Sequence, residues 1–162
     1  MVISEWNELF VAAAGAAAAL AGLIIVAMSV NVQTIIASRS LTSRAGATVA
    51  ALVLILVVSV AGLIPAQPLA VIGAEVLVFS IAAMIPAVGS AWRIAKEREH
   101  STRPQAIAKV ILTIVPVVLF LVSGILLALS DPTGLYWVAA GTIVVFTSSV
   151  LNAWVMLVEI LR

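Results

Sequence analysis

Five long apolar stretches constrain this chain more than any other feature of its sequence. A helix that crosses the hydrocarbon core of a bilayer needs about 20 predominantly apolar residues, and each stretch is long enough. The composition is 64% hydrophobic and 9% charged, whereas soluble domains carry ~25% charged residues. We therefore predict an all-α fold, a single transmembrane domain over residues 1–162 built as a five-helix membrane bundle. The predicted spans are residues 9–36, 45–64, 69–91, 106–129 and 135–160.

The basic residues all fall on one side of this topology. They flank the first connection, occupy or border the third, and end the chain: Arg39, Arg44, Arg93, Lys96, Arg98, Arg103, Lys109 and Arg162. Short loops rich in Lys and Arg stay cytoplasmic. We expect a multi-pass protein of the cell's inner (plasma) membrane, with its N-terminus outside and its C-terminus and loop 92–105 inside. The acidic opening, with Glu5 and Glu8, lacks the basic start of a cleaved signal peptide, so we expect the first span to be retained.

Several function classes are excluded by composition and motif. A net charge of +1 argues against nucleic acid as a partner. The chain has no cysteine and one histidine, His100, so it cannot supply about four nitrogen or sulfur ligands to a structural zinc ion. It also lacks a nucleophile–base pair and a glycine-rich phosphate loop. We expect no enzymatic activity, cofactor or metal centre.

Glu75 is the most informative single residue, because it is the only charged residue in the third span. It follows Leu69 by six residues, which places it roughly 9 Å below the outer boundary at ~1.5 Å per residue. A carboxylate at that depth should face protein or water, and such groups often mark proton or cation pathways. Two interpretations stay open, a pathway residue and a structural hydrogen bond. The group could be protonated, bound to a cation or hydrated.

A second polar cluster is predicted at the inner boundary. Thr142, Ser149, Asn152 and Glu159 share one face of the fifth span, since they recur at helical spacing. The first span contributes Asn31, with Ser29 and Gln33, near the same depth. Glu159 could pair with Arg44 or Arg162. The cluster is either a cytoplasmic vestibule, with Asn31, Asn152 and Glu159 as pathway candidates, or a set of interhelical hydrogen bonds.

Three acidic residues, Glu5, Glu8 and Asp131, form a rim at the opposite boundary. In one subunit they would be a solvated edge. In a symmetric oligomer they would become a ring of carboxylates, which attracts cations.

The first span has an unusual number of small side chains, because alanine and glycine dominate residues 12–22. Gly15, Ala19 and Gly22 follow the small-xxx-small spacing that lets helices approach closely in a membrane. We expect this surface to pack against other helices, within the subunit or across a homo-oligomer. A genome composition that favours alanine is the alternative explanation.

Two prolines, Pro86 and Pro116, fall inside the third and fourth spans. Each removes a backbone hydrogen bond and should bend its helix. Such bends either shape packing or line a cavity.

The two ends of the chain resemble a known family. The residues on which this resemblance rests are Glu5-Trp6 with Leu9-Phe10, then 15–16, 20–23 and 26–31, and finally 152–160 with Asn152, Trp154 and Glu159. They are similar to those of small multi-span membrane proteins of bacteria, actinobacteria especially. Some of these are labelled modulators of the membrane protease FtsH. The resemblance implies a five-helix bundle and assigns no residue a role.

Two functions follow as hypotheses. The first is a homo-oligomeric ion channel or small-solute transporter with an intramembrane carboxylate, in which a cation or proton is the partner and symmetric assembly supplies the path. The second is a regulatory membrane protein with no flux of its own. Its basic loop, through Arg93, Lys96, Arg98 and Arg103, would contact a partner protein or anionic lipid.

Overall fold

Five long helices make up the fold, as predicted. The computed structural model describes residues 3–30, 32, 39–96 and 103–158. After a short 3-10 helix, η1 (Ile3–Trp6), the helices are α1 (Asn7–Val30), α3 (Arg39–Gly62), α4 (Leu69–Lys96), α5 (Arg103–Ala128) and α6 (Gly134–Val158). Among these described residues there is no strand, so the all-α prediction is confirmed. The predicted end of the first span, at 36, lies outside the described residues.

Each of the five helices is long and apolar enough to cross a membrane. The qualifying segments are Asn7–Val30, Thr42–Gly62, Leu69–Ile94, Val110–Ala128 and Gly134–Trp154. Segments of 19 to 26 residues correspond to roughly 29–39 Å of helix, which matches a hydrocarbon core of ~30 Å. The chain is therefore built as a multi-pass membrane protein.

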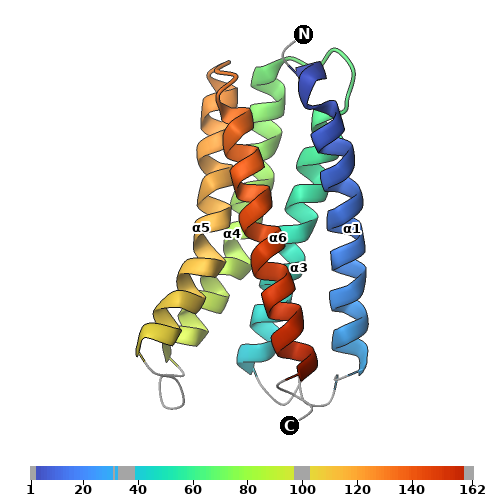
Figure 1. Cartoon of the computed structure of the whole chain (residues 1–162). Helices are drawn as coiled ribbons and strands as arrows, with labels where there is room; N and C mark the ends of the chain where they lie inside the picture. The colour runs from blue at the N-terminus through green and yellow to red at the C-terminus, as the bar shows by residue number, and fades with distance from the viewer. Residues whose placement is uncertain (1–2, 31, 33–38, 97–102, 159–162) are drawn as a thin grey trace.

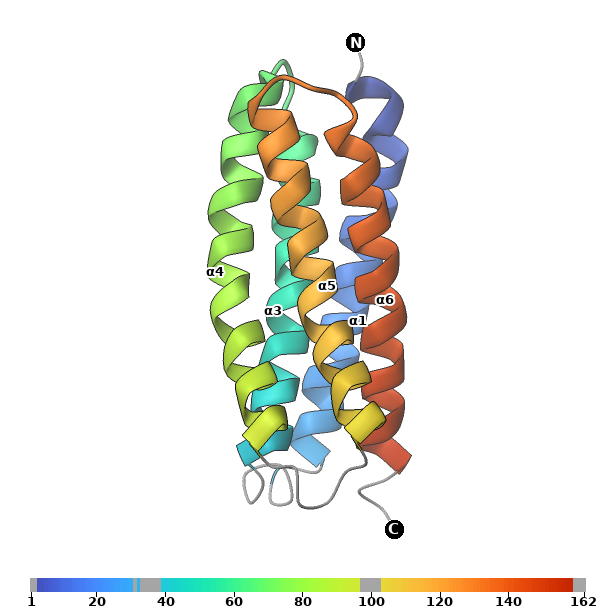
Figure 2. The ribbon, with the colours of Figure 1, turned by 90° about the vertical axis from the view of Figure 1, so that its left-hand side faces the viewer.

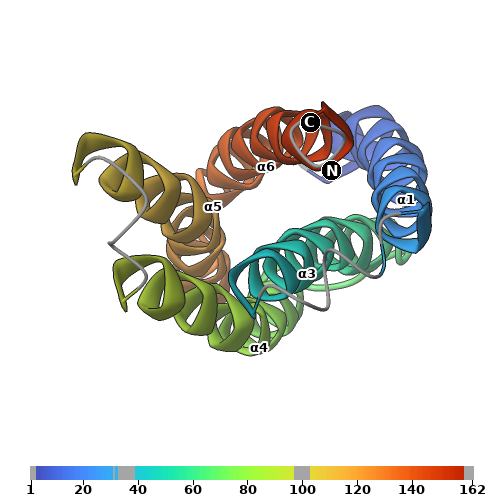
Figure 3. The same cartoon turned by 90° about the horizontal axis from the view of Figure 1, so that it is seen from below.

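The helices form a closed bundle in which chain order is spatial order. Seen along the axis, α1, α3, α4, α5 and α6 follow one another around the bundle, and α6 returns to α1 (Figure 3). The start of α1 and the two tight turns lie at one end, which we call the N end, and the end of α6 lies at the other, the C end (Figures 1 and 2). The starts of α3 and α5 and the end of α4 lie at the C end, and they carry Arg39, Arg103 and Lys96.

The turns at the N end have defined hydrogen bonds. At the end of α5, Ser130 N–H donates to Leu127 O (2.8 Å) and Asp131 N–H to Leu126 O (2.9 Å). This pair of bonds is a Schellman C-cap, and Ser130 takes the left-handed conformation it requires, with φ 62°. Asp131 then accepts from the backbone N–H and hydroxyl of Thr133 (2.9 and 2.8 Å). The turn thus ends α5 and starts α6 within a few residues.

Aromatic side chains mark both ends of the bundle. At the N end, the Trp6 and Tyr136 rings meet edge to face, with centroids 4.9 Å apart. At the C end, Trp92 and Trp154 are exposed. Tryptophan and tyrosine concentrate at membrane–water interfaces, so these residues indicate where the two boundaries lie.

Helices α4 and α5 pack backbone against backbone near the N end. A Cβ added at Gly73 would stand 2.1 Å from the backbone nitrogen of Ala128. One at Gly124 would stand 2.7 Å from the Leu77 side chain. Only glycine permits this approach. At the C end, by contrast, α4 and α5 lean away from α3 and α6 (Figure 1). Each has a proline inside it, Pro86 and Pro116.

The interior between the helices is mainly apolar, with a few small serine and threonine side chains buried in it. Its largest fully buried side chains include Phe10, Ile24, Leu52, Ile55 and Phe120. A bundle filled in this way is held by close packing rather than by a polar centre. Polar chemistry is therefore confined to a few places, two of which are described next.

Candidate functional sites

The first site is a carboxylate–amide pair near the N end. Glu75 lies in the second turn of α4, and Gln67 lies in the connection before that helix, between Pro65 and Pro68. The Gln67 Nε2 amide donates to Glu75 Oε1 at 2.9 Å, and both side chains are partly buried. Pro68 lacks an N–H and begins the turn that leads into α4. The connection thereby places the Gln67 side chain beside α4, the helix that it precedes.

Two oxygens of this pair have no hydrogen-bond partner. Both Gln67 Oε1 and Glu75 Oε2 are buried, and neither receives a donor from the described residues. Buried polar atoms in proteins are paired with few exceptions, so each exception calls for an explanation. Here the two unpaired atoms are acceptors on adjacent side chains. A positively charged or donating group is what such a pair of acceptors lacks.

An apolar groove lies beside this pair on the face formed by α3 and α4. Its volume is about 300 Å³, and Glu75 is its single ionisable lining residue. The other walls are Leu56, Val57, Val60 and Ala61 of α3, Ile64 of the connection that follows α3, and Phe79 of α4. Val60, Ile64 and Phe79 are exposed, so the groove opens on the bundle surface that faces lipid.

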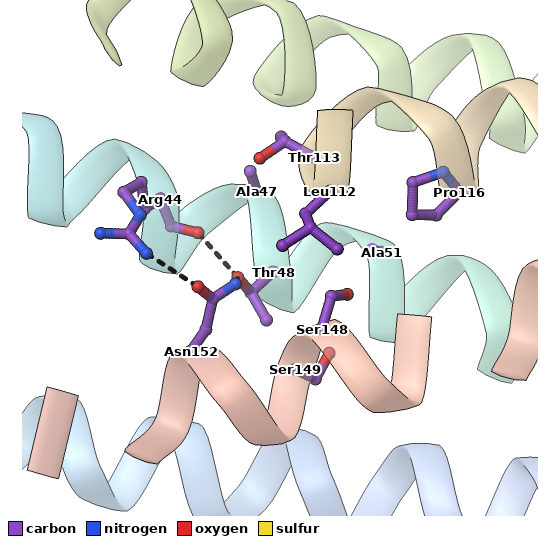
Figure 4. A pocket seen from close by; sticks show the side chains of 10 residues that line it. All are labelled: Arg44, Ala47, Thr48, Ala51, Leu112, Thr113, Pro116, Ser148, Ser149 and Asn152. Carbon is purple, nitrogen blue, oxygen red and sulfur yellow. Dashed lines mark hydrogen bonds between the residues drawn. The ribbon is translucent and has the colours of Figure 1, made fainter. Parts of the chain in front are cut away.

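The second site is a hydrogen-bonded cluster toward the C end. Arg44 of α3 donates to Asn152 Oδ1 of α6 at 2.9 Å, and Asn152 Nδ2 donates to the Thr48 hydroxyl at 3.1 Å (Figure 4). Thr48 in turn donates to the backbone oxygen of Arg44 at 2.9 Å. The side-chain amide of Asn152 is thus held at both ends and ties α6 to α3. Asn152 was predicted here, whereas the suggested pairing of Glu159 with Arg44 falls outside the described residues.

A small polar cavity adjoins the Arg44–Asn152 cluster. It is lined by α3, α5 and α6, with Thr113, Pro116, Ser148 and Ser149 among its walls (Figure 4). The hydroxyl of Ser149 is buried without a hydrogen-bond partner. The cavity volume of about 20 Å³ has room for about one water molecule. The cluster therefore links α6 to α3 by hydrogen bonds, and the cavity beside it has room for water rather than for a larger solute. A wider cytoplasmic vestibule stays a prediction.

Of the first-span residues expected near this cluster, the structure describes Ser29 alone. Ser29 is exposed, and its hydroxyl donates to the backbone oxygen of Ile25 in the same helix (2.9 Å). Asn31, Gln33 and Glu159 lie outside the described residues. Thr142 and Ser149 are buried on the predicted face of α6.

The acidic rim separates into two kinds of residue. Glu5 and Glu8 are exposed at the start of the chain. Asp131 instead belongs to the turn between α5 and α6, where hydrogen bonds from Thr133 lower the pKa of its carboxyl below the ordinary value. Its geometry is accounted for by the turn.

The small-residue surface of α1 points away from the rest of the bundle. The helix buries Phe10, Ala13, Ala17, Ile24 and Ala27, whereas Gly15, Ala19 and Gly22 are exposed. A Cβ added at either glycine would meet nothing within 4 Å. Packing within the subunit is therefore not the reason for these glycines. Packing against a second molecule stays a prediction.

The basic loop is described only in part. Arg93 is exposed near the end of α4. The backbones of Lys96 and Arg103 end α4 and begin α5, and Arg98 lies outside the described residues.

The two polar sites are separated by buried apolar side chains. Leu52, Val117, Phe120 and Val145 come from three helices and fill the middle of the bundle. Among the described residues, the core between the two polar ends is thus mainly apolar, although hydroxyls such as those of Ser80 and Thr142 are buried in it as well. No group of three or more His, Cys, Asp and Glu that could hold a metal ion occurs in this part of the chain either.

The chain was compared with protein-family models, curated proteins and solved structures. No family model, curated protein or solved structure matches it.

Proposed function

We propose that this chain is a homo-oligomeric membrane transport protein in which Glu75 binds a proton or a monovalent cation. One observation carries the proposal. Glu75 Oε2 and Gln67 Oε1 are buried acceptors without a donor, and they belong to the same hydrogen-bonded pair. Uncompensated burial of such atoms costs about 1–3 kcal/mol each. A proton or cation shared by the pair would remove that cost.

Assembly is the second element of the proposal. Gly15 and Gly22 each destabilise a helix by about 1 kcal/mol relative to alanine, and neither glycine gains a contact within its own subunit. Close approach of another helix would compensate, because small residues allow backbone contact in lipid. The apolar middle of one subunit also favours a path that is completed by a neighbour.

The membrane and the orientation form part of the same proposal. The basic ends of α3, α4 and α5 gather at the C end, which the positive-inside rule places in the cytoplasm. Because the chain has no cysteine, single-cysteine labelling is direct. An impermeant maleimide should label Thr133→Cys on intact cells. It should label Arg103→Cys only after lysis.

The test is proton and cation flux into liposomes that contain purified protein. Glu75→Gln keeps the shape and the bond to Gln67 but removes the exchangeable charge, so it should reduce flux at least ~10-fold, the equivalent of ~1.4 kcal/mol. Glu97→Gln is the control, since it removes one carboxylate in the same way from the sequence between α4 and α5, which the transport proposal does not use, and it should leave flux within about twofold. Equal flux in wild type and Glu75→Gln would refute the role of Glu75.

A second candidate function is a regulatory protein that binds another membrane protein. The exposed small-residue surface of α1 favours it, because a partner's helix would fit there as well as a second copy. The resemblance to proteins labelled FtsH modulators points the same way. Native mass spectrometry from nanodiscs separates the two, since a closed homo-oligomer supports transport. A monomer that transports nothing supports the regulator.

A further inference from the structure

The groove beside Glu75 has a composition that selects its ligand. Five apolar side chains, four from α3 and one from the connection after it, face Glu75 and Phe79 of α4, and the groove volume is about 300 Å³. A hydrated inorganic ion would have to lose its water against these walls, which offer it a single carboxylate and no ring of oxygen ligands. The walls favour a ligand that brings apolar surface of its own.

The groove continues along the same two helices toward the C end. A second hollow of about 170 Å³ shares Val57 and Phe79 with the first. Its remaining walls, among them Ala50, Val53 and Ala82, are apolar. The two hollows together form an elongated apolar trough with its one ionisable group, Glu75, in the first hollow.

The cation-binding features of the trough lie next to each other. Glu75 and Phe79 are four residues apart on α4, so they are neighbours on one helix face. A carboxylate attracts an ammonium group directly, and the face of an aromatic ring attracts it through its quadrupole. Glu75 Oε2 has no hydrogen-bond partner. A rotation about the terminal torsion of this side chain would turn a carboxylate oxygen toward the groove.

We propose that the α3–α4 groove binds lipophilic primary ammonium compounds. The ammonium group sits between the Glu75 carboxylate and the Phe79 ring, and an aryl or alkyl body lies along Val57 and Val60. This inference rests on the proposed role of Glu75 as a cation site, and it names the substrate class of that site. Access is from the lipid, because Val60, Ile64 and Phe79 are exposed on this face.

The test compares a charged probe with its uncharged isostere. 4-(4-Fluorophenyl)butylamine and the corresponding alcohol are titrated into nanodiscs of phosphatidylcholine with and without protein, and binding is followed by fluorine NMR. The amine should bind at least ~10-fold more tightly than the alcohol, as expected when one charge-assisted contact is added. Glu75→Gln should remove that preference while leaving the weak binding of the alcohol.

A second variant tests the groove without touching the carboxylate. Val60→Trp fills the trough from an exposed position and should weaken amine binding at least ~10-fold, whereas Ile143→Trp, on exposed surface of α6, should have no effect. The proposal is overturned if wild type does not bind the amine, if amine and alcohol bind equally, or if Val60→Trp binds like wild type. Equal binding of the amine and the alcohol would indicate that the trough binds apolar chains, such as lipid acyl chains, without regard to charge.

The transport proposal and the groove proposal can be refuted independently of each other. Flux of protons, of inorganic cations and of the amine itself is measured on the same preparations. Loss of flux in Glu75→Gln together with amine binding that does not depend on Glu75 overturns the groove proposal alone. Amine binding that depends on Glu75, in a protein without flux, overturns the transport proposal alone.

Discussion

Replacing Gly73 by alanine should separate α4 from α5 at the N end. The added Cβ would stand 2.1 Å from Ala128 N, whereas ordinary contact begins at 3.4 Å, so the helices must part by about 1.3 Å (3.4 minus 2.1) along that direction. The obstacle is backbone, which cannot turn aside as a side chain can. Overpacking of this kind costs about 1–3 kcal/mol or more. Alanine recovers about 1 kcal/mol through helix propensity, which leaves a net loss of about 2 kcal/mol at the upper end of that range.

Gly89→Ala is the matched control in the same helix. A Cβ at Gly89 would meet nothing within 4 Å, so this variant should gain up to about 1 kcal/mol from helix propensity. Both variants are compared with wild type by unfolding in mixed micelles, with the four tryptophans as fluorescent reporters. Because both variants gain the same helix propensity, Gly73→Ala should be less stable than Gly89→Ala by the overpacking cost alone, about 1–3 kcal/mol. Equal stability of the two variants would refute the backbone contact between α4 and α5.

Four further outcomes are expected. Asn152→Leu should destabilise the bundle by about 2 kcal/mol, because the two hydrogen bonds of its side-chain amide to Arg44 and Thr48 are lost. The same micelle unfolding assay measures this. Ser130→Gly should stabilise by about 1 kcal/mol, since it relieves a left-handed φ of 62°, and a lower melting temperature would contradict the cap geometry. Hydrogen bonds from Thr133 lower the pKa of Asp131 below its ordinary value of 3.8. The stability of wild type relative to Asp131→Asn should therefore be greatest above pH 3.8 and should shrink as the pH falls through the lowered pKa. Stability curves of the two proteins that stay parallel down to strongly acidic pH would contradict this. Gly15→Leu with Gly22→Leu should convert the oligomer to monomer in native mass spectra, while unfolding of the subunit changes little, because neither site has a neighbour within 4 Å.

The helices were predictable because a membrane imposes one strong rule. Every backbone group in lipid must be satisfied internally, so long apolar stretches become helices wherever they occur. The ends at Gly62, Leu69, Ala128 and Gly134 follow from proline and turn residues that the sequence displays. Spacing also indicated that Thr142, Ser149 and Asn152 share a buried face.

The hydrogen-bond partners of the polar residues were harder to predict from the sequence. The sequence offers Glu75 no basic residue at its depth, whereas its hydrogen-bond partner in the structure is a neutral amide eight positions earlier. The signal was a glutamine held between two prolines directly before the helix. Likewise, Arg44 pairs with Asn152, a contact between residues 108 positions apart that depends on how the bundle closes.

The orientation of α1 in the bundle could not be predicted from the sequence either. Its small residues indicate close packing, and they do not indicate which of the faces turns inward. The structure buries Ala13 and Ala17 and leaves Gly15, Ala19 and Gly22 outside. A pattern of small residues on every side fixes no direction, because the apolar contrast that orients other helices is missing.

Infrared difference spectroscopy of Glu75 tests the central claim most directly. Wild type and Glu75→Gln in nanodiscs are exposed to a change of pH and then to a change from sodium to a large organic cation. If Glu75 is an exchangeable proton or cation site, wild type should show carboxyl bands that respond to these changes and that are absent in Glu75→Gln. Identical difference spectra for the two proteins would mean that Glu75 serves only as the hydrogen-bond partner of Gln67.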